Sequence, residues 1–236
     1  MVKVLELFSG TRSIGKVCDK LGWESVSVDL IMEADHKCDI MDFDYKQYDK
    51  DEFDIVWASP PCTEYSQLKL CWINRKLKNG TIYTKEENEK DMLEADKLVL
   101  KTLEIINYFN CEYWFMENPV GRLKDREIMK DKFYHIVDYC MYSDWGYKKS
   151  TCIWTNKKDW KALRCNKKCG NMENGKHKNN LATSSYAIID GKHKAINTAE
   201  LRQKYKHLII KNDRPTFSQQ DRYRIPEDLI FSLFLD

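Results

Sequence analysis

The sequence predicts an α/β fold, a mostly parallel sheet flanked by helices, on three observations. An apolar strand pattern over residues 2–8 is followed at once by a helix pattern over 13–21. Two later apolar runs, 54–59 and 113–116, are rich in β-branched and aromatic residues and end in proline-containing loops. A long amphipathic helix pattern over 86–109 leads into the second run. Strands that alternate with helices in this way form parallel sheets.

The remaining elements follow in chain order. Gly22 is the expected stop of the first helix, and strands are expected over 26–30 and 52–59. Residues 135–142 and 151–155 are expected to form an antiparallel pair that turns around 144–146. Pro226 suits the first turn of a short closing helix. Between these, residues 157–213 have a weak apolar pattern and many Lys and Asn, which predicts a small, loop-rich subdomain beside a main domain of 1–156 plus 214–236.

Bulk composition excludes several classes of protein. A chain of 236 residues with 42% hydrophobic residues can bury one α/β core with a small appendage. No apolar run reaches the ~20 residues of a membrane span, and no signal peptide pattern is present, so we expect a soluble intracellular protein with no membrane partner. Nine cysteines are an odd number and are expected to be reduced thiols. A net charge of +2 excludes a strongly basic nucleic-acid binder, and a monomer is the simplest expectation.

The two proline-containing loops offer a thiol and a carboxylate at strand ends. Cys62 closes the loop 59–62, and Glu117 opens the loop 117–119. Ligands of α/β sheets gather at such carboxyl ends. Alone, a Pro-Cys pair is more often a buried structural thiol, and Glu-Asn-Pro is more often a turn. Their occurrence together, after a first strand of cofactor-binding type, favours chemistry on a small planar target.

These loops resemble the Pro-Cys and Glu-Asn motifs of the DNA (cytosine-5) methyltransferase family, above all its compact phage and viral members. Residues 4–10 look like the first, cofactor-binding motif of that family and 23–29 like the second. Asp39-Ile40, 150–156 and 224–226 resemble later motifs with decreasing fidelity. The resemblance covers residues 1 to about 156 well and the remainder thinly. It implies a Rossmann-like S-adenosylmethionine (SAM)-dependent methyltransferase fold in which 157–213 recognise the target, located in a bacterial cytoplasm or, if viral, in the host cell.

The resemblance also implies a reaction and its residues. Cys62 would add to C6 of a flipped cytosine in double-stranded DNA, Glu117 would stabilise the ring at N3, and SAM would methylate C5. The implied substrate-binding residues are Ser59, Pro61, Asn118, Lys148 and Ser150. The implied cofactor-binding residues are Phe8, Ser9, Gly10, Thr11, Asp29, Leu30, Asp39, Ile40 and Pro60. Backbone N–H groups at the start of the first helix are expected to bind the cofactor carboxylate, and Asp29 its ribose.

Three departures from the family pattern leave alternatives open. Thr11-Arg12-Ser13 replace a glycine pair, so Arg12 either crowds the cofactor pocket or reaches outwards, and 218–221 replace a C-terminal cofactor segment. Ser150 and Cys152 align with two arginines, and Lys148 or Lys149 would have to supply the cation without the planar fork of arginine. A catalytically impaired DNA- or SAM-binding homologue is therefore one alternative. An RNA (tRNA) cytosine C5-methyltransferase is another, since a related branch uses the same two motifs.

Two basic patches near these motifs are candidates for phosphate contacts, although lysine-rich loops are often ordinary solvated surface. The first comprises Lys69, Arg75, Lys76 and Lys78, and the second Lys157, Lys158, Lys161, Arg164, Lys167, Lys168, Lys176 and Lys178.

Cys165, Cys169 and His177 have a spacing compatible with zinc. The fourth ligand is not evident, His193, His207 and Cys152 being candidates. Free thiols on a lysine-rich loop are the favoured explanation.

Overall fold

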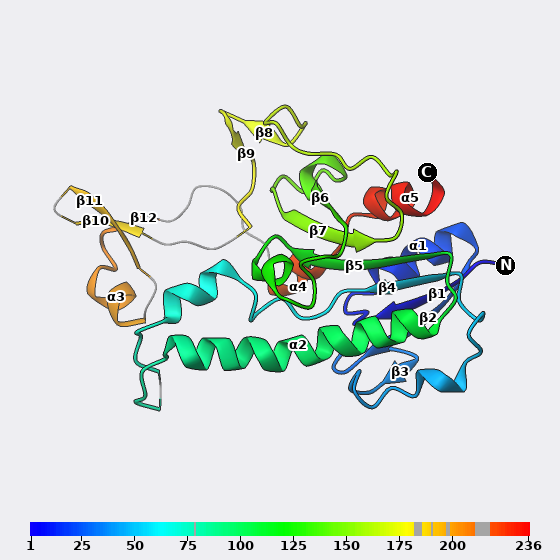
Figure 1. The fold of residues 1–236 in the computed structure, drawn as a ribbon. Helices are drawn as coiled ribbons and strands as arrows, with labels where there is room; N and C mark the ends of the chain where they lie inside the picture. Colours follow the sequence, from blue (N-terminus) through cyan, green and yellow to red (C-terminus); the bar gives the residue numbers. More distant parts are fainter. Residues whose placement is uncertain (78, 182–185, 190, 197–198, 211–217) are drawn as a thin grey trace.

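The core of the protein is a seven-stranded sheet (Figure 1). The computed structural model describes all residues except 78, 182–185, 190, 197–198 and 211–217. The strands lie in the order β3 (His36–Lys37), β2 (Glu24–Asp29), β1 (Lys3–Leu7), β4 (Ile55–Ala58), β5 (Tyr113–Pro119), β7 (Ser150–Thr155) and β6 (Tyr134–Asp138).

The sheet is parallel from β3 to β5 and antiparallel at its β7 and β6 edge. The predicted α/β fold is confirmed, and so is the predicted antiparallel pair, which β6 and β7 form. The chain order reverses at β1, whose neighbours are β2 and β4. A reversal of this kind opens a crevice at the carboxyl ends of the strands, which is the usual ligand site of a Rossmann-like fold.

Helices cover both faces of this sheet (Figure 1). On one face, α2 (Lys85–Tyr108) packs Val99, Leu103 and Ile106 against the sheet. Its start is fixed by a capping box in which Thr84 accepts the Glu87 N–H and Glu87 accepts the Thr84 N–H. On the other face lie α1 (Ser13–Leu21) and α5 (Glu227–Leu235), which contact each other. The last helix of the chain, α5, therefore packs beside its first helix, α1.

The segment after β7 builds small sheets of its own. It contains the hairpin β8 (Met172–Glu173) and β9 (Lys176–His177), and a second sheet of β10 (Tyr186–Ile189), β11 (Lys192–Ala195) and β12 (Ile209–Ile210). The short helix α3 (Ala199–Lys204) lies between β11 and β12, and α4 (Gln219–Tyr223) follows β12. Short 3-10 turns η1 (Tyr45–Gln47), η2 (Gln67–Trp72), η3 (Arg122–Asp125) and η4 (Tyr139–Met141) complete the elements. Among the described residues, no helix has the length and apolar character needed to cross a membrane.

Candidate active site

The structure brings the predicted thiol and carboxylate loops together at one edge of the sheet. β4 and β5 are parallel neighbours with Ala58 opposite Met116, so the residues that follow Ala58 lie beside Glu117 and Asn118. The Asn118 Nδ2 donates to the Pro60 carbonyl oxygen at 2.9 Å, which ties the two loops to each other. Burial raises the pKa of the Cys62 thiol, and the nearby Glu117 carboxylate raises it further. Cys62 and Glu117 therefore share one electrostatic environment.

Glu117 is buried against two donors. Its side chain is only 6% exposed, and its Oε1 accepts a hydrogen bond from the Tyr139 hydroxyl at 2.9 Å. The Lys149 Nζ lies 3.5 Å from the same oxygen, and Lys149 is itself only 8% exposed. Lys149 also lies over the Tyr139 ring and donates to the Arg222 carbonyl oxygen. Glu117, Lys149 and Tyr139 form a compact polar cluster at the end of β5.

Lys149 is the cation at Glu117, one of the two lysines that the sequence left open for this position. In β7, Ile153 lies opposite Glu117 and Cys152 opposite Asn118. Because strand side chains alternate between faces, Lys149 falls on the Glu117 side, whereas Cys152 packs in the core on the α2 side. A cation therefore lies beside Glu117, on a residue just outside the aligned pair.

Lys148 and Ser150 point to a different partner. The Lys148 Nζ lies 3.5 Å from Asp138, and the Ser150 hydroxyl donates to the same carboxylate at 2.5 Å. Arg164 also contacts Asp138, at 3.0 Å. The structure therefore separates these two predicted substrate-binding residues from Glu117 and places them around Asp138.

The Cys62 loop is held against the turn that follows β5. The Arg122 N–H donates to the Tyr65 carbonyl oxygen, and its guanidinium donates to the Glu64 carbonyl oxygen, both at 2.7–2.8 Å. Gly121 leaves no room at this contact, because a Cβ built there would lie 2.6 Å from the Tyr65 carbonyl oxygen. The position of the thiol loop therefore depends on a close approach of two backbones.

We predict that Gly121→Ala displaces the Cys62 loop and lowers the activity of this site, although alanine tolerates the backbone conformation at this position. The φ of Gly121 is −157°, which alanine also adopts, so the clash with Tyr65 is the main cost. Displacement of a reacting group by about 1 Å can cost up to ~100-fold in rate, and we expect kcat to fall at least about tenfold. Gly170→Ala is the matched control, because open space surrounds that position. Equal kcat values in both variants would contradict the prediction.

The predicted cofactor loop has an unusual backbone. Phe8 (φ 58°), Gly10 (φ 49°) and Arg12 (φ 54°) all adopt left-handed conformations, which are rare for non-glycine residues. Such conformations are concentrated at functional sites. Ser9 has a buried hydroxyl without a hydrogen-bond partner among the described residues. An orphaned polar atom at the end of β1 fits a loop that binds a polar ligand.

Asp29 holds this loop to the next one. Its Oδ2 accepts the Gly10 N–H, and its Oδ1 accepts the N–H groups of Ile31 and Met32, all at 2.8 Å. A carboxylate has about four acceptor positions, so these three bonds leave capacity for a ligand. Next to Asp29, Leu30 is 59% exposed and Ile31 is 77% exposed. The end of β2 thus offers an acid beside an exposed apolar shelf.

The other predicted cofactor residues have mixed surroundings. Asp39 is half-buried and caps its own turn through the Met41 N–H, whereas Ile40 is buried in the core. Thr11 has its hydroxyl 3.1 Å from that of Ser13. Pro60 is buried, and Pro61 is exposed. Ser59 accepts a hydrogen bond from the Trp57 indole N–H.

The start of α1 is already occupied by a protein carboxylate, which corrects one expectation. Glu6, in the centre of β1, accepts the N–H groups of Ile14 and Gly15 at 3.1 and 3.0 Å. These two donors are therefore not available to a ligand carboxylate. Arg12 folds back across Gly15, with its Nη2 3.4 Å from the Ser25 hydroxyl, so it reaches towards β2. The signal in the sequence was a single acid inside an apolar strand.

We predict that Glu6→Gln removes a pH dependence of stability. Burial raises the pKa of Glu6 to about 7, from an ordinary value of 4.5. Between these values the folded protein holds the proton and the unfolded chain does not, so the contribution of Glu6 to stability is full below 4.5 and is lost as pH rises through about 7. Across this pH range, the free energy of unfolding measured with urea should therefore fall by about 3 kcal/mol more in the wild type than in the variant. Free energies of unfolding that change equally with pH in the wild type and in Glu6→Gln would contradict this prediction.

Several lysines and arginines of the predicted basic patches have protein partners. Lys69 pairs with Glu64 and Asp91, Lys157 donates to the Leu233 carbonyl oxygen, and Lys178 donates to the Gly170 carbonyl oxygen. Lys158 lies over the Phe133 ring. Lys78 lies outside the described residues. Lys148, Lys167 and Lys176 line a common pocket of about 530 Å³ with Cys165 and His177.

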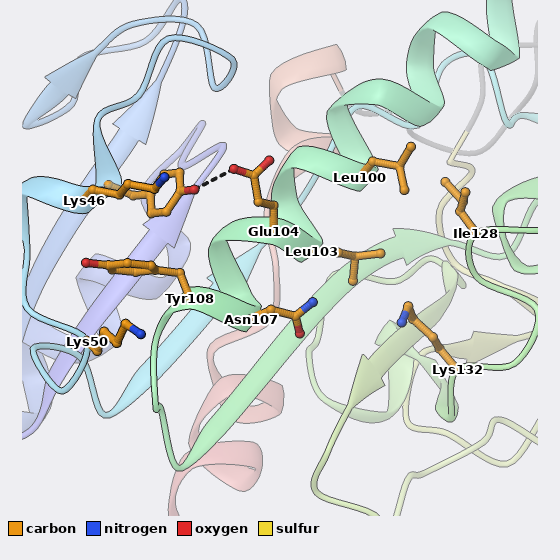
Figure 2. Close-up of a pocket in the computed structure, with 10 residues that line it drawn as sticks. Lys46, Lys50, Leu100, Leu103, Glu104, Asn107, Tyr108, Ile128 and Lys132 are labelled. Atoms are coloured by element: carbon orange, nitrogen blue, oxygen red, sulfur yellow. Dashed lines mark hydrogen bonds between the residues drawn. The ribbon is translucent and has the colours of Figure 1, made fainter.

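A larger surface pocket lies away from these groups. It has a volume of about 780 Å³ and is lined by the C-terminal half of α2 and by residues around η1, including Tyr45, Lys46 and Lys50 (Figure 2). The Tyr45 hydroxyl donates to Glu104, another residue that lines this pocket. The C-terminus of α2 leads into the start of β5, whereas Glu117 lies near the end of that strand. The pocket therefore lies towards the opposite end of the sheet.

Comparison with known proteins identifies the family. No family model matches the chain. A curated relative, the probable DNA (cytosine-5)-methyltransferase of Frog virus 3 (isolate Goorha), is 36% identical over 218 residues, which are 89% of this chain and 97% of the relative.

Solved structures show weaker similarity. A putative DNA modification methyltransferase encoded within an E. coli prophage matches 94% of this chain and 73% of its own, at 11% identity and a TM-score of 0.44. The S. pombe Dnmt2 methyltransferase matches 66% of this chain and 49% of its own, at 14% identity and a TM-score of 0.41. At these identities and TM-scores, the two structures do not identify the family. The viral relative, which spans nearly the whole chain, shows that this protein belongs to the DNA (cytosine-5)-methyltransferase family.

Proposed function

We propose that the protein transfers a methyl group from SAM to C5 of cytosine in double-stranded DNA. The observation that carries this proposal is the convergence of Cys62, Glu117 and Lys149 at the carboxyl ends of β4 and β5. A nucleophile, a carboxyl group and a cation are the groups that this reaction needs around one planar ring. The viral relative carries the same activity in its name.

Cys62 acts as the nucleophile. The thiol proton is lost to water, Sγ bonds to C6, and the displaced electron pair of the C5–C6 double bond makes C5 nucleophilic. After C5 accepts the methyl group of SAM, with S-adenosylhomocysteine as the leaving group, water takes the C5 proton. The C5–H electron pair then restores the double bond, and the C6–S bond breaks to release the Cys62 thiolate. Burial and Glu117 raise the pKa of this thiol and so favour its neutral form. The Lys149 ammonium lowers the pKa and so favours the attacking thiolate.

Glu117 stabilises the ring. Tyr139 and Lys149 both contact Oε1, so we assign Oε2 to the N3 edge of the cytosine. A hydrogen bond or proton shared at N3 offsets the negative charge that builds on the ring when Sγ adds. Burial raises the pKa of Tyr139 well above its ordinary value, so its hydroxyl remains a donor. Lys149 and Tyr139 therefore fix the orientation of the Glu117 carboxyl group.

SAM, when bound, supplies an electrophilic methyl group to C5. Phe8, Ser9, Gly10 and Asp29 are the residues we assign to its binding, with Leu30 and Ile31 beside its adenine. The orphaned Ser9 hydroxyl and the exposed apolar shelf after β2 support this assignment. Ser13 accepts the Ile225 N–H, so the C-terminal segment closes one side of the loop.

The target base must leave the helix to react. Glu117 is 6% exposed, and C5 and C6 of a stacked cytosine cannot reach a group at that depth. Flipping a base costs a few kcal/mol, which binding of the surrounding DNA must supply. We assign that binding to residues 157–213.

The test is mass spectrometry of nucleosides from a methylation-free bacterial host that expresses the protein. 5-Methyldeoxycytidine in DNA is the expected product. Methylcytidine in RNA alone would replace the DNA substrate with RNA. Neither product, from protein that binds SAM in calorimetry, would indicate a non-catalytic homologue. That last alternative follows from Ser150 and Cys152 in place of two arginines, and the Lys149 cation beside Glu117 disfavours it.

A further inference from the structure

Four side chains with metal-binding atoms meet beyond the edge of the main sheet. The Sγ atoms of Cys140, Cys165 and Cys169 and a ring nitrogen of His177 all lie within 4.8 Å of one another. Sequence spacing predicted three of these residues. The fourth, Cys140, was not among the candidates, because it lies in η4, far upstream of the other three. Of the earlier candidates, Cys152 is buried in the core on the α2 side of the sheet.

The distances fit a tetrahedral zinc centre. The Sγ atoms of Cys165 and Cys169 are 3.6 Å apart, and each lies 3.4–3.6 Å from the Nε2 of His177. Zinc bonds of about 2.3 Å to sulfur and about 2.0–2.1 Å to nitrogen, at tetrahedral angles, separate two sulfurs by about 3.8 Å and a sulfur from a nitrogen by about 3.5 Å. A disulfide would need the two sulfurs at about 2.05 Å. The arrangement therefore matches shared ligation of one ion and excludes a disulfide between these two sulfurs.

The local backbone shapes the site. In the turn from Cys165 to Cys169, Lys167 adopts a left-handed conformation (φ 67°) and donates its N–H to the Cys165 Sγ. After Cys169, the hairpin of β8 and β9 turns through Asn174 and Gly175, both with positive φ, which suits a two-residue hairpin turn. This hairpin returns the chain so that His177 reaches both cysteines.

Hydrogen bonds within the protein hold the segment that carries Cys165 and Cys169 next to Cys140. Asp138 accepts the Cys165 N–H at 2.7 Å, which fixes the turn to the end of β6. Asn171 is buried and donates to the carbonyl oxygens of Cys140 and Ser143 at 2.9 and 2.7 Å. The Gly146 N–H donates to the Asn171 side chain. The ligands are thus positioned by contacts that do not involve a metal, as a preorganised site requires.

We propose that Cys140, Cys165, Cys169 and His177 bind one structural zinc ion. Three thiolates and an imidazole form a set of four protein ligands, which closes the coordination sphere and is typical of structural zinc. The softness of the thiolates disfavours magnesium and calcium. The ion clamps residues 165–177 to the β6 edge of the catalytic sheet, beside the Asp138 cluster that holds Lys148 and Ser150. This inference does not depend on the methylation reaction.

Metal analysis of the full chain, purified without a polyhistidine tag, tests the proposal. About one equivalent of zinc per chain is expected. Cys169→Ser should reduce it below about a tenth, whereas Cys71→Ser, an exposed cysteine in η2, should leave it unchanged. His177→Cys should retain metal, because it converts the site to four thiolates. Less than a tenth of an equivalent in the wild type, or full zinc in Cys169→Ser, would overturn the proposal.

A second measurement covers the case in which a variant fails to fold. Trypsin should cleave the wild type at Lys167, Lys168 or Lys176 at least about tenfold faster after a chelator removes zinc, and readdition of zinc should restore protection. Cleavage at Lys132, outside the clamped segment, is the internal control and should change little. Cleavage rates unaffected by the chelator would contradict a structural ion, as would a disulfide between these cysteines in mapped peptides of the unreduced protein. Neither readout requires methyl transfer, so failure of the zinc site and failure of the proposed reaction are distinguishable.

Discussion

Replacing Cys62 by alanine should abolish methyl transfer to cytosine and leave SAM binding nearly intact. The thiol forms the covalent bond to C6 that makes C5 nucleophilic, and alanine has no group that replaces it. SAM binding is assigned to the ends of β1 and β2, which the substitution leaves in place. We expect less than about a tenth of wild-type transfer from labelled SAM, with the SAM Kd changed by less than about threefold.

Cys71→Ala is the matched control for Cys62→Ala. Cys71 is an exposed thiol in η2, on the same connection between β4 and α2, and no part of the proposed reaction uses it. Its activity should equal that of the wild type. Transfer above a tenth of wild type in Cys62→Ala would remove Cys62 from the role of nucleophile.

Replacing Lys149 by methionine should lower kcat by about 100-fold, the loss expected for one preorganised charge in a water-excluded site. Methionine keeps much of the apolar stem of lysine but leaves Glu117 buried without its cation, an arrangement that is costly. It also removes the charge that lowers the pKa of Cys62, so alkylation of Cys62 by iodoacetamide should require a higher pH than in the wild type. Lys149→Arg, which keeps the charge, should recover part of the activity.

Lys148→Met is the control that distinguishes the two neighbouring lysines. Lys148 is more exposed and contacts Asp138, so its removal should change kcat by less than about threefold and leave the alkylation profile of Cys62 in place. If Lys148→Met were the more damaging substitution, the assignment of the cation to Lys149 would be wrong.

The fold and the paired loops were predictable because short-range signals specify them. Apolar β-branched runs such as Ile55–Ala58, when turn residues follow them, favour buried strands, and the loops that follow parallel neighbours meet at the carboxyl ends of those strands. Cys62 and Glu117 could therefore be placed together from the sequence. That they perform the proposed chemistry remains a prediction of this account.

The remaining features of the site depend on long-range contacts and on the face that each strand residue occupies, and these could not be predicted from the sequence. The sequence could not decide between Lys148 and Lys149 because the face that a strand residue occupies depends on register, which short motifs do not specify. Cys140 was missed because its partners, Cys165 and Cys169, come close only through the β6 edge and the turn held by Asp138. Glu6 occupies helix donors that the sequence left for a ligand. That 157–213 recognise the target likewise remains a prediction.

The most direct test of the central claim is covalent trapping on DNA that contains 5-fluorodeoxycytidine. Fluorine at C5 leaves no proton to lose after methylation, so the bond between Cys62 and C6 cannot be released. If Cys62 is the nucleophile, a SAM-dependent protein–DNA adduct should form, and its tryptic peptide should map to Cys62. Cys62→Ala should form no such adduct. An adduct at another cysteine, or methylation of ordinary cytosine by a protein that forms no adduct with the fluorinated base, would contradict it.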